Sequence, residues 1–108
     1  MNKHIFTLQA DICKTLGNPK RLEIIDALCK GELTVTELVE RLRVPKANVS
    51  QHLAILRSKR LVATRREGLK IYYSIANPKI IKACGMMREV LFEQLEESGK
   101  LAKGFKMG

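Results

Sequence analysis

Two short helices separated by a tight turn are predicted between residues 34 and 58. In the first segment apolar side chains recur at the spacing of one helix face, at Val35, Leu38, Val39 and Leu42. Thr34 followed three positions later by Glu37 is typical of a capping box, which places the start of the helix here. The turn follows at Val44 and Pro45, because proline cannot continue a helix and restricts the backbone of the residue before it.

The second helix of this pair begins near Lys46 and has a small, uncharged, polar outer surface. Its inward positions are Val49, Leu53 and Leu56. Its outward positions are Ala47, Gln51, Ala54 and Ser58, with Asn48 and Ser50 on their flanks. Asparagine, glutamine and serine can pair with base edges, and short side chains let a helix approach the major groove closely. Two interpretations are open: the recognition helix of a helix-turn-helix, or an amphipathic helix with an ordinary polar outside.

The distribution of charge favours the recognition helix. The 108 residues include 20 Lys and Arg against 11 Asp and Glu, a formal net charge of +9. Residues 41–70 contain nine of the basic residues and one acid, Glu67, so +8 of this charge falls in that range. The nine are Arg41, Arg43, Lys46, Arg57, Lys59, Arg60, Arg65, Arg66 and Lys70. A basic surface concentrated in this way is the electrostatic signature of a protein that binds nucleic-acid phosphates.

The same patterns predict the elements on either side. We expect helices over 4–16, 21–30 and about 78–97, and a hairpin with strands 61–66 and 69–75. Asn-Pro pairs at 18–19 and 77–78 suit helix starts, because asparagine caps a helix and proline fits its first turn. In the second helix Leu22, Ile25 and Leu28 are expected inward, and Gly31 closes it.

The hairpin is expected to turn at Glu67 and Gly68, since glycine can take a positive φ there. Alternation of Leu69, Ile71, Tyr73 and Ile75 with polar neighbours predicts a half-buried second strand. Basic residues flank the tip, at Arg65, Arg66 and Lys70. A basic hairpin directly after a recognition helix is typical of a wing that reaches the DNA backbone or minor groove. The alternative is a solvated hairpin with charged edges.

The final helix has more apolar surface than a chain of this length can cover alone. Its longest apolar line is Ile80, Cys84, Met87, Leu91 and Leu95. The first helix has a shorter line that includes Leu8 and Ile12. A small domain buries only a modest core, so we expect a second copy of the chain to cover these faces. Packing within the monomer is the alternative.

Other features limit the class of protein. No apolar run approaches the length of a membrane span, and the N-terminus lacks a signal-peptide hydrophobic region, so we expect a cytoplasmic protein with no membrane partner. Three widely spaced cysteines do not make a disulfide framework. The two histidines, His4 and His52, lie in no nucleophile motif, and there is no glycine-rich phosphate loop, so an enzyme is not expected. Residues 1–97 are expected to form one domain and 98–108 a basic flexible tail.

Three motifs resemble one known family. They are KTLGNPKRLEII (14–25), ELTVTELVERL (32–42) and NVSQHLAILRSKRLVATRREGLKIYYSI (48–75). With the final helix they make the chain resemble the ArsR/SmtB family of dimeric winged-helix repressors over about residues 5–97. The resemblance implies a mostly α fold with five helices, a small β-hairpin wing and a dimer formed through the terminal helices. It also implies a repressor that binds double-stranded operator DNA until an inducer weakens the complex.

The resemblance places Ser50, Gln51 and His52 at the part of the recognition helix that the family uses on DNA. On a helical wheel His52 lies nearer the core than Gln51, so either DNA contact or packing is open for it. With the flanking residues and the wing, the predicted DNA-binding set is Lys46, Asn48, Ser50, Gln51, His52, Arg57, Arg65, Arg66 and Lys70.

A sensor site is less well marked. The two cysteines of the family's soft-metal motif are replaced here by Thr34 and Thr36, and hydroxyls are poor ligands for soft ions. The final helix contains no histidine, so the family's zinc site is not expected. Cys13 and Cys84 could meet where the terminal helices pack, as a thiol sensor that binds a soft metal(loid) or forms a disulfide or polysulfide link. Cys29 is not expected to join them. The alternative is that each cysteine is a small buried core residue.

The predicted function is therefore a sequence-specific repressor, with no cofactor beyond a soft metal(loid) ion that the cysteines could hold. The competing hypothesis is an accessory or architectural DNA-binding protein that responds to no inducer. Release from DNA by thiol oxidants, persulfide, arsenite or Zn(II) would separate the two.

Overall fold

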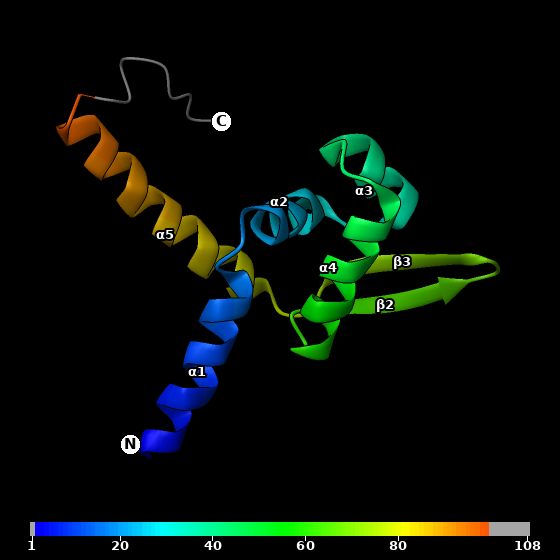
Figure 1. The fold of residues 1–108 in the computed structure, drawn as a ribbon, viewed down its shortest axis with the longest axis horizontal. Coiled ribbons are helices and arrows are strands. Elements are labelled where there is room, and N and C mark those ends of the chain that lie inside the picture. The colour runs from blue at the N-terminus through cyan, green and yellow to red at the C-terminus, as the bar shows by residue number, and fades with distance from the viewer. Residues whose placement is uncertain (1, 100–108) are drawn as a thin grey trace.

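The computed structural model describes residues 2–99, and this part of the chain forms five α-helices and a three-stranded antiparallel sheet (Figure 1). The elements in chain order are α1 (Lys3–Leu16), α2 (Pro19–Ala27), the 3-10 turn η1 (Leu28–Lys30), β1 (Leu33–Thr34), α3 (Val35–Leu42), α4 (Lys46–Ser58), β2 (Val62–Glu67), β3 (Lys70–Ile75) and α5 (Pro78–Glu97). The predicted order of helices, helix-turn-helix, hairpin and final helix is confirmed. Most of the predicted tail, residues 100–108, lies outside the described residues.

Side-chain caps set most of the helix starts. The Asn18 side chain accepts hydrogen bonds from two backbone N–H groups of α2, and Asn77 does the same for one N–H of α5. Thr34 and Glu37 form both halves of the predicted capping box at α3. The bounds of α2 differ from the prediction: it begins at Pro19, in the first helical position that proline suits, and ends at Ala27. Gly31, with φ of +147°, ends the 3-10 turn that follows.

The sheet contains a strand that the sequence pattern did not predict. The strand order is β1-β3-β2, with Leu33 opposite Tyr73 and Thr34 opposite Tyr72. A strand of only two residues is too short to show an alternation of apolar and polar positions. Because Thr34 is also the N-cap of α3, β1 joins the hairpin directly to the first helix of the helix-turn-helix.

The tip of the hairpin was predicted one residue too early. Glu67 pairs with Lys70, so the loop residues are Gly68 and Leu69 rather than Glu67 and Gly68. Gly68 has φ of +61° at the first loop position, which fits a type II′ turn. Leu69 is 98% exposed, and Ile71 is also exposed, so the predicted half-buried face of β3 does not reach the tip. The tip of the hairpin extends beyond the core there (Figure 1).

One apolar core joins α2, α3, α4 and the base of the sheet. Its fully buried side chains include Leu38, Leu53 and Leu56, as predicted for the helix-turn-helix. The prediction was wrong for Leu22, which is exposed, whereas Ile24 is buried. Ile24 is covered because α2 contacts α3, α4 and α5, whereas Leu22 lines an open recess beside α2.

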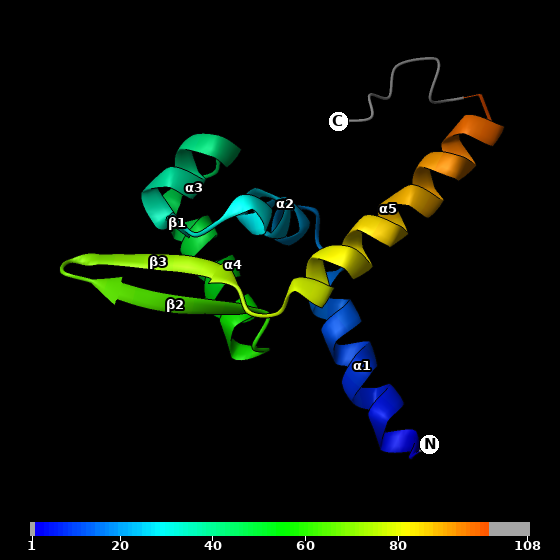
Figure 2. The same cartoon turned by 180° about the vertical axis from the view of Figure 1, so that it is seen from behind.

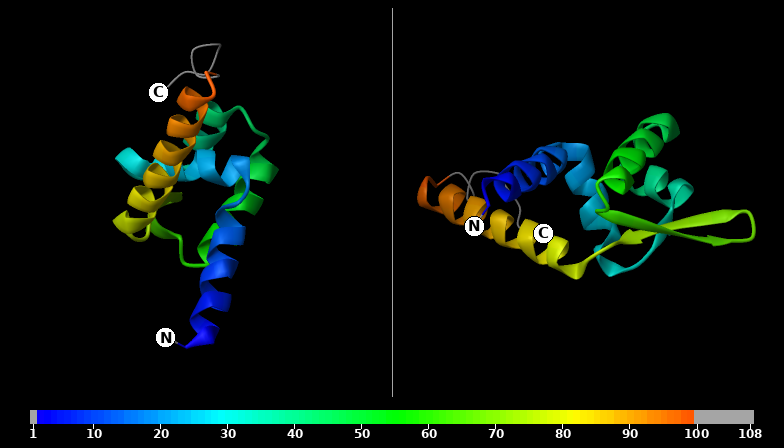
Figure 3. Two further views of the ribbon diagram at one scale, coloured as in Figure 1. Left: turned by 90° about the vertical axis from the view of Figure 1, so that its left-hand side faces the viewer. Right: turned by 90° about the horizontal axis from the view of Figure 1, so that it is seen from below.

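The terminal helices α1 and α5 both project from the side of the core opposite the hairpin and diverge from each other (Figures 1 and 2), and seen from below they extend to the same side (Figure 3). No apolar side chain of either helix is fully buried within residues 2–99. The apolar residues exposed on them are Ile5, Phe6, Leu8, Ile12, Met86, Met87, Val90 and Leu91. None of the described helices is both long enough and apolar enough to span a membrane.

The predicted apolar line of α5 is divided by this arrangement. Ile80 and Cys84 are half-buried and pack against the core of their own protomer, so the first turns of the helix belong to the monomer. Met87 and Leu91 lie farther along the helix and are 70% and 50% exposed. Ile80 and Cys84 therefore contribute to the monomer core, because α5 docks on α2 and β3 before it projects, and their place in the intermolecular seam stays a prediction.

Candidate nucleic-acid interface

The outer face of α4 is open to solvent. Asn48, Ser50 and Gln51 are all exposed, while Val49 and Leu53 on the inner face are completely buried. Each hydrogen-bonding side chain of the outer face is therefore held on a helix that the core fixes in place. This is the arrangement that direct contact with base edges requires.

The N-terminus of α4 differs from those of the other helices. Side chains cap α1, α2, α3 and α5, whereas within residues 2–99 no side chain caps α4, whose N-cap is Pro45. The first backbone N–H groups of a helix have no partner within it, and the helix dipole makes this end positive. Lys46 is exposed at the same end. An anion such as a DNA phosphate suits this position. The absence of Ser, Thr, Asp or Asn before Lys46 was visible in the sequence.

The turn between α3 and α4 uses a backbone conformation that is uncommon for residues other than glycine. Arg43 has φ of +54°, and its N–H donates to the carbonyl oxygen of Val39 at 2.8 Å. Val44 is buried beneath the turn. The left-handed conformation costs a residue with a Cβ about 1 kcal/mol. The turn therefore holds an exposed arginine beside the start of α4.

His52 contacts its own protein on the side nearest α2. Arg21 Nε donates to His52 Nδ1 at 3.3 Å, and Arg21 Nη1 donates to the Thr15 carbonyl oxygen at 2.9 Å. Burial and, secondarily, the charge of Arg21 lower the pKa of His52, so the ring is neutral at pH 7 with its proton on Nε2. These contacts favour packing over DNA contact for His52, and they link α1, α2 and α4.

The three basic residues of the wing have different surroundings. Arg65 donates to both carboxylate oxygens of Glu32, from Nε at 3.1 Å and from Nη2 at 2.5 Å, and to Glu67 from Nη1 at 2.8 Å. Its guanidinium also lies over the Tyr72 ring, 4.7 Å from the centroid. Arg66 and Lys70 are exposed and form no ion pair with any residue from 2 to 99.

A recess connects the wing with the start of α4. It has a volume of about 690 Å³ and lies between α3 and β3. Lys46 from α4 and Lys70 from β3 both line it, with Thr36 and Glu37 from α3. Two ammonium groups from separate elements therefore share one concave surface next to the uncapped helix end. Arg57, in the last turn of α4, is exposed at the helix's other end.

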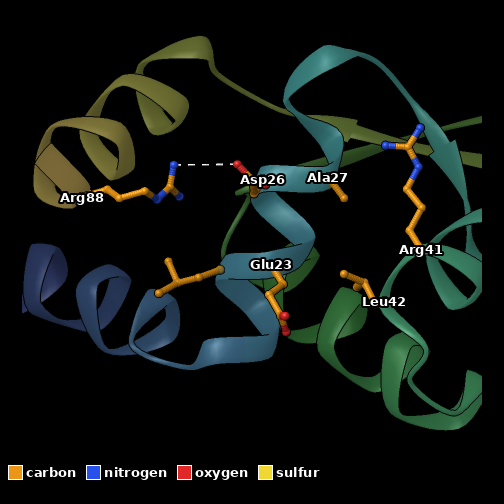
Figure 4. Close-up of a pocket in the computed structure, with 7 residues that line it drawn as sticks. Glu23, Asp26, Ala27, Arg41, Leu42 and Arg88 are labelled. Atoms are coloured by element: carbon orange, nitrogen blue, oxygen red, sulfur yellow. Dashed lines mark ion pairs between the residues drawn. The ribbon is translucent and has the colours of Figure 1, made fainter. Parts of the chain in front are cut away.

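A second recess, of about 480 Å³, lies between α2, α3 and α5 (Figure 4). Arg88 of α5 reaches across it toward Asp26 of α2, with 3.7 Å between Nη1 and Oδ1. Both side chains are largely exposed, and exposed ion pairs contribute little stability because water and salt screen them. Arg41 and Leu42 line the opposite side of the recess.

The cysteines do not match the expected core residues. Cys13 and Cys29 are exposed and Cys84 is half-buried, and none of the three is in a disulfide. Full burial was therefore wrong for Cys13 and Cys29 within one protomer. Burial raises the pKa of Cys84, although Arg88 opposes the rise, so Cys84 is a thiol at neutral pH. Residues 2–99 contain no group of three or more His, Cys, Asp or Glu side chains that could hold a metal ion.

Two residues of this surface were missed by the sequence patterns. Glu32 was noted only within a motif, and its pairing with Arg65 depends on the unpredicted strand β1. Arg21 lay in a predicted helix, and its contact with His52 spans 31 positions. Pairings over such separations leave no local periodicity in a sequence.

The fold and the interface can now be compared with known proteins. A family model described as "Bacterial regulatory protein, arsR family" matches residues 18–64, from α2 into β2. The transcriptional repressor PagR of Bacillus anthracis is 44% identical over 72 residues, which cover 66% of this chain and 72% of PagR.

Solved structures agree over most of the chain. The crystal structure of Rv0081 from Mycobacterium tuberculosis has a TM-score of 0.81 and 34% identity, covering 90% of this chain and 98% of Rv0081. A solution structure of Mb0332 from Mycobacterium bovis, described as a homodimeric winged helix-turn-helix DNA-binding domain, has a TM-score of 0.79 and 32% identity over 87% of each chain. The predicted winged helix-turn-helix fold is confirmed.

Proposed function

This chain belongs to the arsR family of bacterial regulatory proteins, and we propose that it is a homodimeric repressor that binds a specific operator sequence in double-stranded DNA. The family is one of DNA-binding transcriptional regulators and not of enzymes, as expected from the lack of a catalytic motif. Sequence-specific repression, the operator and the response to an inducer are the parts that we propose for this chain.

The observation that supports DNA binding most strongly is the surface of α4. Gln51, Ser50 and Asn48 are exposed on a helix whose inner face is buried and whose positive end is uncapped. Base edges in the major groove suit these side chains, and phosphates suit the helix end with Lys46. Arg57, Arg66 and Lys70 extend the positive surface from the helix to the wing.

The exposed faces of α1 and α5 support the homodimer. Met87 and Leu91 recur on one face of α5 and are 70% and 50% exposed, and Leu8 and Ile12 are 50% and 40% exposed on α1. Apolar side chains repeated along a helix face in this way suit a protein–protein contact. The relative Mb0332 is described as homodimeric. Two copies that join through these helices would present two recognition helices to the two halves of a palindromic site.

The experiment that tests this proposal is selection of bound sequences from random duplex DNA, followed by affinity measurements on the selected site. Gln51→Ala should weaken binding to that site by about 1–3 kcal/mol without changing the fold, because it removes hydrogen bonds to a base. Thr7→Ala is the control, since Thr7 is an exposed, uncharged polar residue on α1 that lies outside the apolar line of that helix. Equal losses in the two variants, or no enriched sequence, would contradict the proposal.

We further propose that an inducer releases the protein from its operator. The predicted thiol sensor for this inducer is the pair Cys13 and Cys84. The exposure of Cys13 favours reaction, whereas the raised pKa of Cys84 disfavours the thiolate. Operator release should be measured with arsenite, persulfide and a thiol oxidant on the wild type, Cys13→Ser and Cys84→Ser. If release occurs and survives both substitutions, the sensor lies elsewhere. If nothing releases the protein, the accessory DNA-binding function replaces the inducible repressor.

A further inference from the structure

Arg65 spans the sheet rather than pointing into solvent from it. Arg65 lies opposite Tyr72 in the β2–β3 register, and Tyr72 lies opposite Thr34 in the β1–β3 register. The guanidinium passes over the Tyr72 ring and reaches Glu32, the residue immediately before β1. The Arg65 side chain on β2 therefore crosses the middle strand β3 and donates hydrogen bonds to a residue at the far edge of the sheet.

The far edge leads straight into the helix-turn-helix. Leu33 is buried in the core, and Thr34 both pairs with β3 and caps α3. Because β1 has only two residues, its backbone pairing with β3 is short. The two hydrogen bonds from Arg65 to Glu32 add a second connection between the wing and the start of α3, with the planar fork geometry that guanidinium and carboxylate share.

The surroundings of Arg65 are unfavourable for a phosphate contact. One guanidinium lies between the carboxylates of Glu32 and Glu67, so the three groups together have a net charge of −1. The hydrogen bond from Arg65 lowers the pKa of Glu32, which keeps that carboxylate ionised near neutral pH. A phosphate approaching Arg65 would meet two negative charges and would compete for donors that are already in use.

Arg66 lies on the opposite face of the hairpin. Successive residues of a strand alternate between faces, so Arg66 shares its face with Thr64 and Val62. Val62 is buried in the core on that face, and α4 packs against β2. Beyond the core, this face is turned toward the same side of the sheet as the recognition helix.

We propose that Arg65 is a positioning residue that fixes the orientation of the wing relative to α3 and α4, while Arg66, on the face turned toward α4, makes a phosphate contact of the wing. This inference rests on the proposed DNA-binding function and revises the role expected for Arg65. Both partners of the Arg65–Glu32 pair are partly exposed, and such pairs contribute little to folding stability. The effect of Arg65 is on the direction in which the wing extends.

The sign of one substitution separates positioning from phosphate contact. Glu32→Gln removes a negative charge, so if Arg65 bound phosphate the operator affinity would rise. If Arg65 positions the wing, the affinity falls about threefold, a size typical of an exposed bidentate pair. Arg65→Lys keeps the positive charge and loses the fork, so positioning predicts a fall of similar size, whereas a phosphate contact would be largely kept.

Arg66→Gln is the matched control. It should reduce the magnitude of the slope of log affinity against log salt by about two, because the homodimer loses one phosphate contact in each protomer, whereas Arg65→Gln should leave the slope unchanged. The double variant Glu32→Gln with Arg65→Gln should bind as weakly as either single variant, because both remove the same connection. Tighter binding by Glu32→Gln, or a reduced slope for Arg65→Gln, overturns the proposal.

Hydrogen exchange on the unbound protein keeps this test separate from the DNA-binding function. Amides of β2 and β3 beyond residue 64 should exchange faster in Glu32→Gln and Arg65→Gln than in the wild type, and unchanged in Arg66→Gln. If the wild type binds no duplex but this exchange pattern is found, the proposed DNA-binding function is wrong, while the role of the Arg65–Glu32 pair in fixing the orientation of the wing is supported. If exchange is the same in the wild type and the three variants, the Arg65–Glu32 pair does not fix the wing, and the proposal is wrong.

Discussion

The helix-turn-helix unit and the two terminal helices differ in how far their apolar side chains are buried. In the unit, Leu38, Val49 and Leu53 are completely buried within one protomer. On the terminal helices, Phe6 and Met87 are 55% and 70% exposed. The periodicity of apolar residues is present in both regions, so the difference lies in whether one chain supplies a covering surface. Periodicity therefore identifies a face that must be buried, and the fold decides whether its own chain or another buries it.

The two regions are joined by few contacts. Lys59 at the end of α4 pairs with Asp11 of α1 at 2.6 Å, and Arg88 of α5 approaches Asp26 of α2. Arg21 connects His52 of α4 with the Thr15 carbonyl oxygen of α1. These contacts lie between the base and about the middle of each terminal helix, and the far ends of both helices extend away from the unit (Figure 1). Changes in the unit should thus act on folding, and changes on the projecting helices on association.

The largest expected effect is on folding, from a substitution inside the unit. Leu53→Ala should lower the free energy of unfolding by about 2–5 kcal/mol, because it removes buried methyl groups and leaves a cavity. Urea unfolding at a fixed protomer concentration measures the change. Leu69→Ala is the matched control, since that side chain is 98% exposed at the wing tip and its loss should change stability by less than about 0.5 kcal/mol. Similar losses for the two leucines would refute the division between regions.

The next effect is on association. Leu91→Asp should raise the dimer dissociation constant roughly a hundredfold, because it places a charge in the apolar contact that we propose between protomers. Sedimentation equilibrium measures the constant, and circular dichroism should show that helix content is kept. Leu69→Asp, in which the same charge lies on the exposed wing tip, should remain dimeric. A Leu91→Asp protein that is still dimeric at low concentration would mean that α5 is not the interface.

The smallest effect concerns the connection between the regions at His52. Its pKa is lowered in the folded state, so the unfolded chain takes up a proton first as the pH falls. The contribution of His52 to the free energy of unfolding is fully present above the ordinary histidine pKa of 6.5. This contribution is lost as the pH falls below 6.5 and through the lowered pKa of the folded state. His52→Gln should reduce this loss as the pH falls below about 6.5, with His4→Gln as the control. Identical pH profiles of stability for wild type and His52→Gln would mean that His52 does not contribute to the loss of stability at low pH.

The sequence predicted what depends on local spacing. The capping box at Thr34, the inward residues of α4 and the Asn-Pro helix starts all follow from neighbours within one or two helical turns. Gly68 was placed in the turn, but the register shift by one residue depended on pairing across the strands. Local sequence spacing therefore predicted whether a segment is a helix, strand or turn more reliably than it predicted which residues pair across the sheet.

The environment of each candidate residue could not be predicted in the same way. Arg65 and Arg66 are adjacent and identical in the sequence, yet one is held by two carboxylates and the other is not. The difference follows from strand alternation together with β1, which brings Glu32 to the sheet from 33 positions away. Cys84 shows the same limit, because its helical spacing matched the intermolecular line while tertiary packing placed it on its own core.

The most direct test of the central claim is a hydroxyl-radical footprint of the wild-type protein on its selected DNA site, read on both strands. A protein that buries its projecting helices in a second copy and uses α4 on DNA should protect two symmetry-related half-sites whose centres lie about one helical turn, roughly 34–36 Å, apart, or a multiple of this. Leu91→Asp should abolish the paired pattern at the same protein concentration. A single, unrepeated protected segment bound by one protomer would contradict the account.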